Sequence, residues 1–214
     1  MNKPKIYLAG PSVFHPESAR IAQLMKNMCE ESGSIGLYPL DNEISPHEGP
    51  NAKFAMGLAI FCANTEMIDE CDAVVADLSP FRGPSADVGT VWEIAYAHGK
   101  GKIITGFTTS HQNYRNRVID NEIRDAKPSK YEKMDEDGLT LDNVTYDSGN
   151  LSVEDFDMQD NLMITGSICR ANKKNMELLL PNGGLSTSFA NALHMALERI
   201  QENNNEKNIN SRVR

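Results

Sequence analysis

The sequence predicts an α/β protein built around a parallel sheet. Short apolar runs typical of buried strands alternate along the chain with segments of helical periodicity. Strands and helices in this alternation are joined by right-handed crossovers between parallel strands. We expect a sheet of about five strands, at residues 6–9, 35–39, 73–78, 103–107 and 176–180.

The first strand and the turn after it give a clear local signal. The run Ile6–Ala9 is apolar and ends at Gly10 and Pro11, a pair that marks a sharp turn. A helix is predicted from Pro16, because proline suits the first turn of a helix. Gly33 ends that helix.

Further helices are predicted at residues 51–70, 87–98 and 185–201, with a short one near 114–125. The segment 88–97 is expected to be a buried helix, because Glu93 is the only charged residue in it. Trp92 and Tyr96 are four residues apart on this helix, and we expect them to pack in the core.

The chain has 214 residues, which fits one domain with a sizeable core. We assign this domain to residues 1–203. Residues 108–150 are polar and show little periodicity, so we expect them to form a surface insertion. The polar residues 204–214 are predicted to be a disordered tail.

The composition argues against several partners. The formal net charge of −9 disfavours a nucleic-acid backbone or an anionic membrane. No segment has the apolar length of a membrane span and no secretory signal is apparent, so we expect a cytoplasmic protein. The four cysteines form no CxxC pair and have no histidine at zinc-ligand spacing, so no metal site is expected.

Three carboxylates follow or begin predicted elements. Asp77 comes at the end of the third strand, Asp87 at the start of the next helix, and Glu93 within that helix. Burying a charge is costly unless the charge is paired or used. Ligands of open parallel sheets bind outside the carboxyl ends of the strands, so one crevice there would hold all three acids.

Each acid also has a structural interpretation. Asp87 would be a helix N-cap, and Asp77 would brace the loop that follows it. Glu93 would need a cation such as Arg82 as its partner. As a functional cluster, carboxylates near one pocket suit glycosidic chemistry, in which one acts as nucleophile or cation stabiliser and another protonates the leaving group.

Signals for a phosphate group are weak. Gly10-Pro11-Ser12 is not a P-loop, and no GxGxxG follows the first strand, so an uncharged nucleoside is favoured over a nucleotide. Acid clusters also bind magnesium, which leaves a magnesium-dependent phosphotransferase as an alternative that EDTA would stop. Tyr7 and Phe14 would line a pocket for a flat base, with core packing as the alternative for Tyr7.

Several motifs together resemble the nucleoside 2-deoxyribosyltransferase family. They are Lys5–Phe14, Asp41–Glu43, Cys71–Gly83, Asp87–Glu93 and Asn161–Ile164. The resemblance covers the first half of the chain and residues 153–164. It implies a flavodoxin-like (Rossmann-like) three-layer sandwich and transfer of 2-deoxyribose between nucleobases, without a cofactor.

The resemblance also implies roles for site residues. Glu93 matches a nucleophile that attacks C1′ and holds a covalent deoxyribosyl intermediate until a second base attacks. Asp77 and Asp87 match acids that contact base and sugar, and one of them would protonate the departing base. Tyr7 matches a tyrosine that positions the nucleophile.

Other implied contacts come from a second subunit. Asn161 and Met163 match residues that reach the sugar from a neighbouring subunit, which implies a homo-oligomer between a dimer and a hexamer. Asn42 is a looser match to a sugar or base contact. The implied partners are deoxyribonucleosides and free nucleobases, in nucleoside salvage.

Two alternatives differ in kind from a transferase. A hydrolase of 2′-deoxynucleoside 5′-monophosphates would need a donor-rich cradle after the first strand, whereas Gly10–Phe14 is poor in donors. A non-catalytic nucleotide-binding domain would pair Glu93 with a cation such as Arg82. Glu93→Gln would then destabilise the fold and change no turnover.

Overall fold

The computed structural model describes residues 2–124, 147, 151–171 and 184–212. Within these residues four parallel strands form one sheet in the order β2-β1-β3-β4. The strands are β1 Lys5–Ala9, β2 Ile35–Leu37, β3 Ala73–Asp77 and β4 Ile103–Phe107. The predicted parallel α/β fold is confirmed. The strand expected at residues 176–180 lies outside the described residues.

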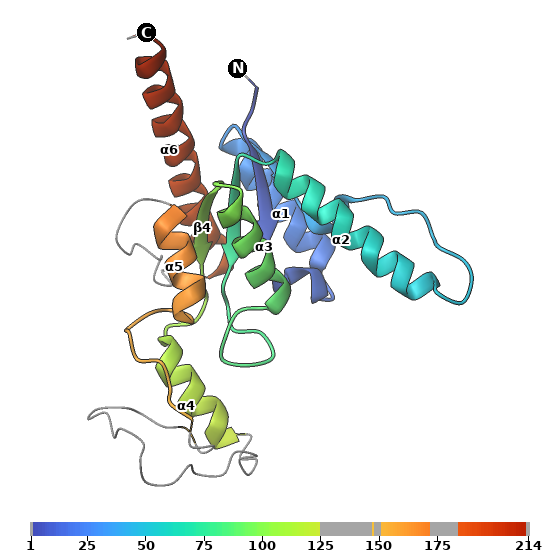
Figure 1. Ribbon diagram of the computed structural model, residues 1–214, viewed down its shortest axis with the longest axis vertical. Helices are drawn as coiled ribbons and strands as arrows, with labels where there is room; N and C mark the ends of the chain where they lie inside the picture. The colour runs from blue at the N-terminus through green and yellow to red at the C-terminus, as the bar shows by residue number, and fades with distance from the viewer. Residues whose placement is uncertain (1, 125–146, 148–150, 172–183, 213–214) are drawn as a thin grey trace.

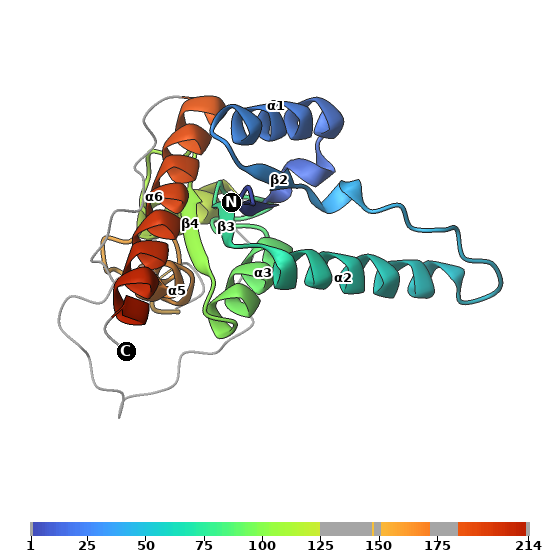
Figure 2. The same ribbon diagram turned by 90° about the horizontal axis from the view of Figure 1, so that it is seen from above.

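Helices cover both faces of this sheet, which gives the three layers. The helices α1 (Ser18–Glu31) and α6 (Leu185–Arg212) pack against one face. The other face is covered by α2 (Ala52–Glu70), α3 (Val88–Gly99) and α5 (Leu162–Ala171). Figure 2 shows α1 and α2 on opposite sides of the strands.

Alternation along the strands divides the core between the two faces. The cluster under α1 and α6 contains Ile6, Leu8, Ala73 and Val75. The cluster under α2, α3 and α5 contains Tyr7, Ala9, Val74 and Ala76. Tyr7 therefore points toward the helix that carries Glu93.

The order of the strands positions the candidate site. β1 pairs with β2 on one side and with β3 on the other, so the direction of winding reverses between β1 and β3. In such sheets ligands bind outside the carboxyl ends of the strands at this reversal. Gly10 follows β1 there and Asp77 ends β3.

Short elements fill the connections. The 3-10 helices η1 (Pro11–Phe14) and η2 (Pro39–Asp41) follow β1 and β2. The helix α4 (Tyr114–Arg124) confirms the short helix predicted there. It begins the expected insertion, most of which lies outside the described residues. Gly33 and Gly101 end α1 and α3 at φ angles of 78° and 69°, in the left-handed region that favours glycine.

Two expectations about helices are wrong. α6 continues to Arg212, so residues 204–212 are helical and not a disordered tail. The α3 helix is not buried on all sides, because Val88 is 83% and Trp92 is 41% exposed. At the surface, Trp92 stacks on Tyr96 and contacts the tilted ring of Phe61, with ring centroids 5.1 and 4.9 Å away.

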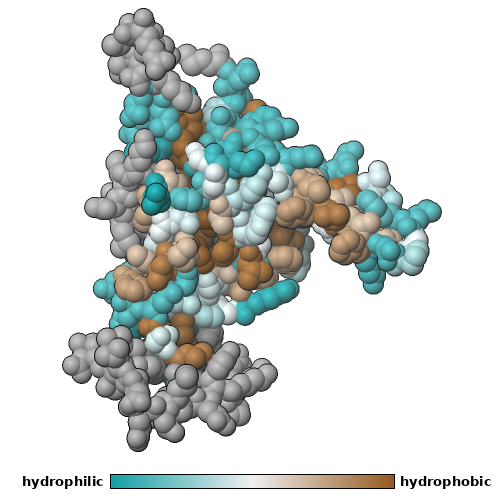
Figure 3. Space-filling model, in the orientation of Figure 1, coloured by the Kyte–Doolittle hydropathy of each residue, from teal (hydrophilic) through white to brown (hydrophobic). Residues whose placement is uncertain are grey.

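The α2 helix projects from the body of the molecule (Figure 1), and only Ile68 of its side chains is buried. Exposed apolar side chains of α2 include Phe54, Leu58 and Phe61. Figure 3 shows apolar surface along this projection. None of the helices in the described ranges is long and apolar enough to cross a membrane.

A close approach at the end of β1 gives a test of the fold. A Cβ placed on Gly10 would lie 2.8 Å from the Cβ of Asp77, so backbone would have to shift. Gly10→Ala is therefore expected to lower the free energy of unfolding by about 1–3 kcal/mol, measured by urea denaturation.

The matched control is Gly57→Ala in α2. Nothing lies within 4 Å of a Cβ at Gly57, so this variant is expected to be as stable as the wild type or slightly more stable. Equal stability of the Gly10 variant and the wild type would contradict the close approach.

Candidate active site

A hydrogen bond between Tyr7 and Glu93 joins the sheet to α3. Tyr7 is fully buried in β1, and its hydroxyl donates to Oε1 of Glu93 at 2.6 Å. Glu93 lies in the second turn of α3, which packs on the sheet face that Tyr7 occupies. Tyr7 binds only Oε1 of Glu93 and makes no hydrogen bond to the other carboxylate oxygen, Oε2.

The surroundings of Glu93 favour its protonated form. Burial raises the pKa of Glu93 to about 7, and the charge of Asp87 acts in the same direction, while the Tyr7 hydrogen bond opposes them. The pKa of Tyr7 is raised far above its usual value, by burial and by Glu93. Tyr7 therefore stays protonated and remains a donor, whereas Glu93 titrates near neutral pH.

No cation neutralises Glu93 in the part of the chain that the structure describes. The guanidinium carbon of Arg82 lies instead over the rings of Phe14 and Phe81, 5.4 and 4.8 Å from their centroids. A purely structural role for Glu93 would require a cation paired with its carboxylate, and Arg82 does not provide it.

Asp87 is the N-cap of α3. Its carboxylate accepts hydrogen bonds from the amide and the hydroxyl of Thr90, at 3.1 and 3.3 Å. The structural interpretation of Asp87 therefore applies. The charge of Asp87 also raises the pKa of Glu93. The carboxylate that caps α3 is thus also the second acid of the candidate site.

Asp77 is buried at the end of β3. Its Oδ1 accepts a hydrogen bond from the amide of Ser79 at 2.9 Å, which braces the loop. Burial raises the pKa of Asp77, and the bonds from Ser79 oppose this shift. By strand alternation Asp77 continues the face of Ala73 and Val75, opposite to the face of Tyr7. Of the two aspartates, Asp87 is the one whose charge raises the pKa of Glu93.

Phe14 lies in η1, just beyond β1, and is 57% exposed. It stacks on Phe81 with a centroid distance of 5.3 Å and an interplanar angle of 17°. Phe81 was not singled out from the sequence, although it follows the third strand as Phe14 follows the first. The two rings give an apolar surface near the strand ends.

Asn42 and Asn161 are both held by neighbours. The amide of Asn42 donates to Pro39 and to Asn64, at 3.3 Å each. Asn161 precedes α5, and its Nδ2 donates to Oε1 of Glu154 at 2.7 Å.

Asn161 and Met163 lie across α3 from Glu93. A cavity of about 400 Å³ between α3 and α5 is lined by Val88, Val91, Asn161 and Met163. Positions 88, 91 and 95 share one face of a helix, whereas position 93 is on the opposite face. Within one chain, these two residues are therefore on the far side of α3 from the candidate nucleophile.

The described ranges contain no group of three or more His, Cys, Asp or Glu side chains arranged to hold a metal ion. The arrangement offers a carboxylate that titrates near neutral pH, a second acid beside it and an aromatic surface. A nucleophile, a nearby acid and a flat apolar surface are the parts that glycosidic chemistry on a base requires.

Comparisons with known proteins identify a family and a fold. The family model described as nucleoside 2-deoxyribosyltransferase matches residues 6–163. A solved 2-desoxiribosyltransferase from Leishmania mexicana is 26% identical, with a TM-score of 0.56, over 89% of this chain and 97% of that chain. The similarity supports a flavodoxin-like fold, with four strands in the described residues.

Two further matches each cover about half of this chain. An uncharacterised protein from Schizosaccharomyces pombe is 33% identical over 117 residues, or 54% of this chain and 54% of that protein. The chain thus spans about half the length of this relative. A 2-deoxyribosyltransferase from Bacillus psychrosaccharolyticus is 22% identical over 54% of this chain and 80% of that chain, and its TM-score of 0.43 is too low to support an argument.

The family model matches residues 6–163, which is most of the chain. The chain therefore belongs to the nucleoside 2-deoxyribosyltransferase family.

Proposed function

We propose that this protein exchanges the base of 2′-deoxyribonucleosides through a covalent deoxyribosyl intermediate on Glu93. The hydrogen bond from buried Tyr7 to Glu93 carries the proposal, because it orients a carboxylate that has no cationic partner in the described chain. Membership of the nucleoside 2-deoxyribosyltransferase family supports the same reaction class.

The first displacement breaks the glycosidic bond. Tyr7 holds Oε1 of Glu93, and the other carboxylate oxygen attacks C1′ of the sugar. The C1′–N bond breaks, its electron pair leaves with the base, and an acid supplies the proton that the base takes up. The carboxylate stabilises the positive charge that develops at C1′.

Asp77 and Asp87 are the candidates for that acid. Burial raises the pKa of Asp77, which favours its protonated form, whereas Asp87 accepts two hydrogen bonds as a helix cap. The raised pKa favours Asp77 as the proton donor, whereas position favours Asp87, because the charge of Asp87 acts on Glu93 and Asp77 continues the opposite face of the sheet. Both acids therefore stay candidates for this role.

The second displacement regenerates the enzyme. A nitrogen of an incoming base attacks C1′ and gives up its proton to the acid that protonated the first base, the bond to Glu93 breaks with its electron pair, and both carboxyl groups return to their starting states. Two displacements at one carbon retain its configuration, as in retaining glycosidases. Water in place of the second base would give slow hydrolysis. Neither displacement requires a redox cofactor.

The substrates fit the rest of the site. The stacked rings of Phe14 and Phe81 offer a flat surface to a nucleobase. Asn42 is a candidate contact to base or sugar. Small deoxyribonucleosides and free bases are thus the proposed substrates, and cytoplasmic nucleoside salvage is the proposed setting.

A homo-oligomer is part of the proposal, with Asn161 and Met163 completing the site of a neighbouring subunit. Both residues are separated from Glu93 of their own chain by α3. Met163 is 70% exposed, and it lines the same cavity as Val88 of α3, which is 83% exposed. Exposed apolar surface of this kind is typical of an interface between proteins.

The activity is tested by incubating the protein with deoxyinosine and free adenine, and we expect deoxyadenosine to form. Glu93→Ala removes the nucleophile and is expected to lower the rate at least about a thousandfold. Glu66→Ala, an exposed glutamate of α2, is the control that should retain activity.

A parallel reaction with deoxyinosine 5′-monophosphate separates the transferase from a hydrolase. Base release from the monophosphate alone, without exchange on the nucleoside, would favour the hydrolase. Near-normal exchange by the Glu93→Ala variant would remove the nucleophile assignment.

Replacing Glu93 with glutamine tests whether its charge costs stability. Its pKa rises from 4.5 to about 7 on folding, so between these values the folded state binds more protons than the unfolded state. The stability that protonated Glu93 contributes is full below pH 4.5 and is lost as the pH rises through about 7.

Glu93→Gln should therefore be more stable than the wild type near pH 8, by roughly 1–2 kcal/mol after allowing for partial solvent exposure. Urea unfolding near pH 8 and below pH 4.5 measures the difference, which should disappear at the lower pH. A variant less stable than the wild type near pH 8 would support a structural charge pair.

The shared site is tested by complementation between inactive variants. Glu93→Ala and Asn161→Ala are each expected to be inactive alone. If each site takes Glu93 from one chain and Asn161 from another, a randomly mixed dimer regains about a quarter of its sites. A mixture of Glu93→Ala with Asp87→Ala is the control, since both changes affect the same chain's contribution. No recovery in the first mixture would contradict the shared site.

A further inference from the structure

A buried ion pair joins α4 to the segment before α5. Nη2 of Arg117 lies 3.3 Å from Oδ2 of Asp160, and their side chains are only 3% and 0% exposed. Every other ion pair in the described ranges has at least one side chain that is more than one third exposed. A buried pair persists only when further hydrogen bonds satisfy its charges.

Asp160 accepts those hydrogen bonds from the two segments that carry candidate site residues. Its carboxylate accepts from the hydroxyl of Ser85 at 2.5 Å and from the amide of Ala86 at 2.9 Å. It also accepts from the amide of Asn161 at 2.8 Å. The carboxylate thus binds the residues directly before Asp87 and the backbone of Asn161 itself.

Arg117 binds the same two segments from the other side. Its Nε donates to the carbonyl of Pro84 at 2.6 Å, and Nη2 donates to the carbonyl of Gln159. Nη1 donates to the carbonyl of Gln112 at 3.1 Å, just before α4. We call Arg117, Asp160 and Ser85 the clasp.

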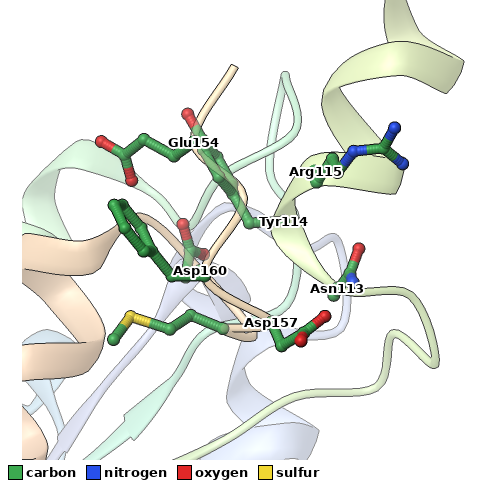
Figure 4. Close-up of a pocket in the computed structure, with 8 residues that line it drawn as sticks. Asn113, Tyr114, Arg115, Glu154, Asp157 and Asp160 are labelled. Carbon is green, nitrogen blue, oxygen red and sulfur yellow. The ribbon is translucent and has the colours of Figure 1, made fainter. Parts of the chain in front are cut away.

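Glu154 extends the clasp to the side chain of Asn161. Its two carboxylate oxygens accept from Nδ2 of Asn161 and from the amide of Leu162, at 2.7 and 3.0 Å. Figure 4 shows Tyr114, Glu154 and Asp160 around a small cavity between the start of α4 and this segment. Glu154, which lines this cavity together with Asp160, therefore orients the side-chain amide of Asn161.

We propose that Arg117 and Asp160 are positioning residues that hold Asp87 and Asn161 in one arrangement, and that the start of the 108–150 insertion serves this purpose. The inference rests on the proposed function, because Asp87 and Asn161 matter as contacts to a substrate. The proposal also assigns a role to α4, because this helix supplies Arg117, which pairs with Asp160.

The arrangement also connects two sites. Asp87 belongs to the site of its own chain, whereas Asn161 is proposed to serve the site of a neighbour. A clasp that binds both segments fixes the position of one site relative to the next within the assembly.

A purely structural ion pair and a positioning pair predict different kinetics. Loss of a structural pair lowers stability and leaves the turnover of each folded molecule unchanged. Loss of a positioning pair lowers kcat of the folded protein, because small displacements of reacting groups are costly.

The test compares Arg117→Lys and Ser85→Ala with Arg115→Lys. Lysine keeps the charge of Arg117 but cannot make its three carbonyl contacts, and Ser85→Ala removes one hydrogen bond to Asp160. Arg115 is on the same helix and pairs with Asp155 in the same segment, 3.1 Å away but partly exposed, which makes it the matched control.

Two readouts are taken on the folded protein. We expect kcat for base exchange to fall about tenfold or more in Arg117→Lys, and less in Ser85→Ala, with Arg115→Lys unchanged. We expect the amides of Ala86 and Asn161 to exchange hydrogen faster in both clasp variants than in the control.

The outcomes separate the two proposals. Unchanged kcat and unchanged protection of these amides in both clasp variants would overturn the clasp. Faster amide exchange with unchanged kcat would also overturn its positioning role. If the wild-type protein exchanges no base at all, the proposed function fails. Hydrogen exchange at the amides of Ala86 and Asn161 then tests by itself whether the clasp holds the two segments, and unchanged exchange in both clasp variants overturns the clasp.

Discussion

The contact on which the site depends is one hydrogen bond between a strand and a helix. Tyr7 lies fully buried in β1, a central strand, so its hydroxyl is fixed by the sheet. It reaches Glu93 because α3 packs on the same face, and the packing that makes this contact also removes water from the carboxylate. Burial raises the pKa of Glu93 and the tyrosine lowers it again in part, so the fold sets the protonation of the group near neutral pH.

Different sides of the α3 helix make different contacts. One side carries Glu93 toward Tyr7, the opposite side lines the cavity shared with α5 and includes Val88, and a third carries the exposed Trp92. Its first turn is capped by Asp87, whose preceding residues are bound by Asp160. Few positions remain for ordinary charged surface residues, which accounts for Glu93 standing alone in an apolar run.

The elements that sequence reasoning predicted are those with a strong periodic signal. Strand and helix alternation follows from apolar spacing, and Glu93 stood out because a charge in an apolar helix is costly. The exposure of Trp92 was missed because an apolar face has the same spacing whether it packs in the core or remains open. Helix in residues 204–212 was missed because a polar composition resembles disorder, although extending a formed helix costs far less than starting one. The pairing of Arg117 with Asp160 had no local signal, since both residues lie in polar segments far apart in sequence.

Trp92 is the only tryptophan in the chain, and it directly precedes Glu93. Its ring lies between the tilted ring of Phe61 of α2 and the stacked ring of Tyr96 of α3, and it is 41% exposed. All intrinsic tryptophan fluorescence of the protein therefore originates beside the candidate nucleophile, on the apolar surface formed by α2 and α3. The emission wavelength and its quenching report on the solvation of that surface without any label.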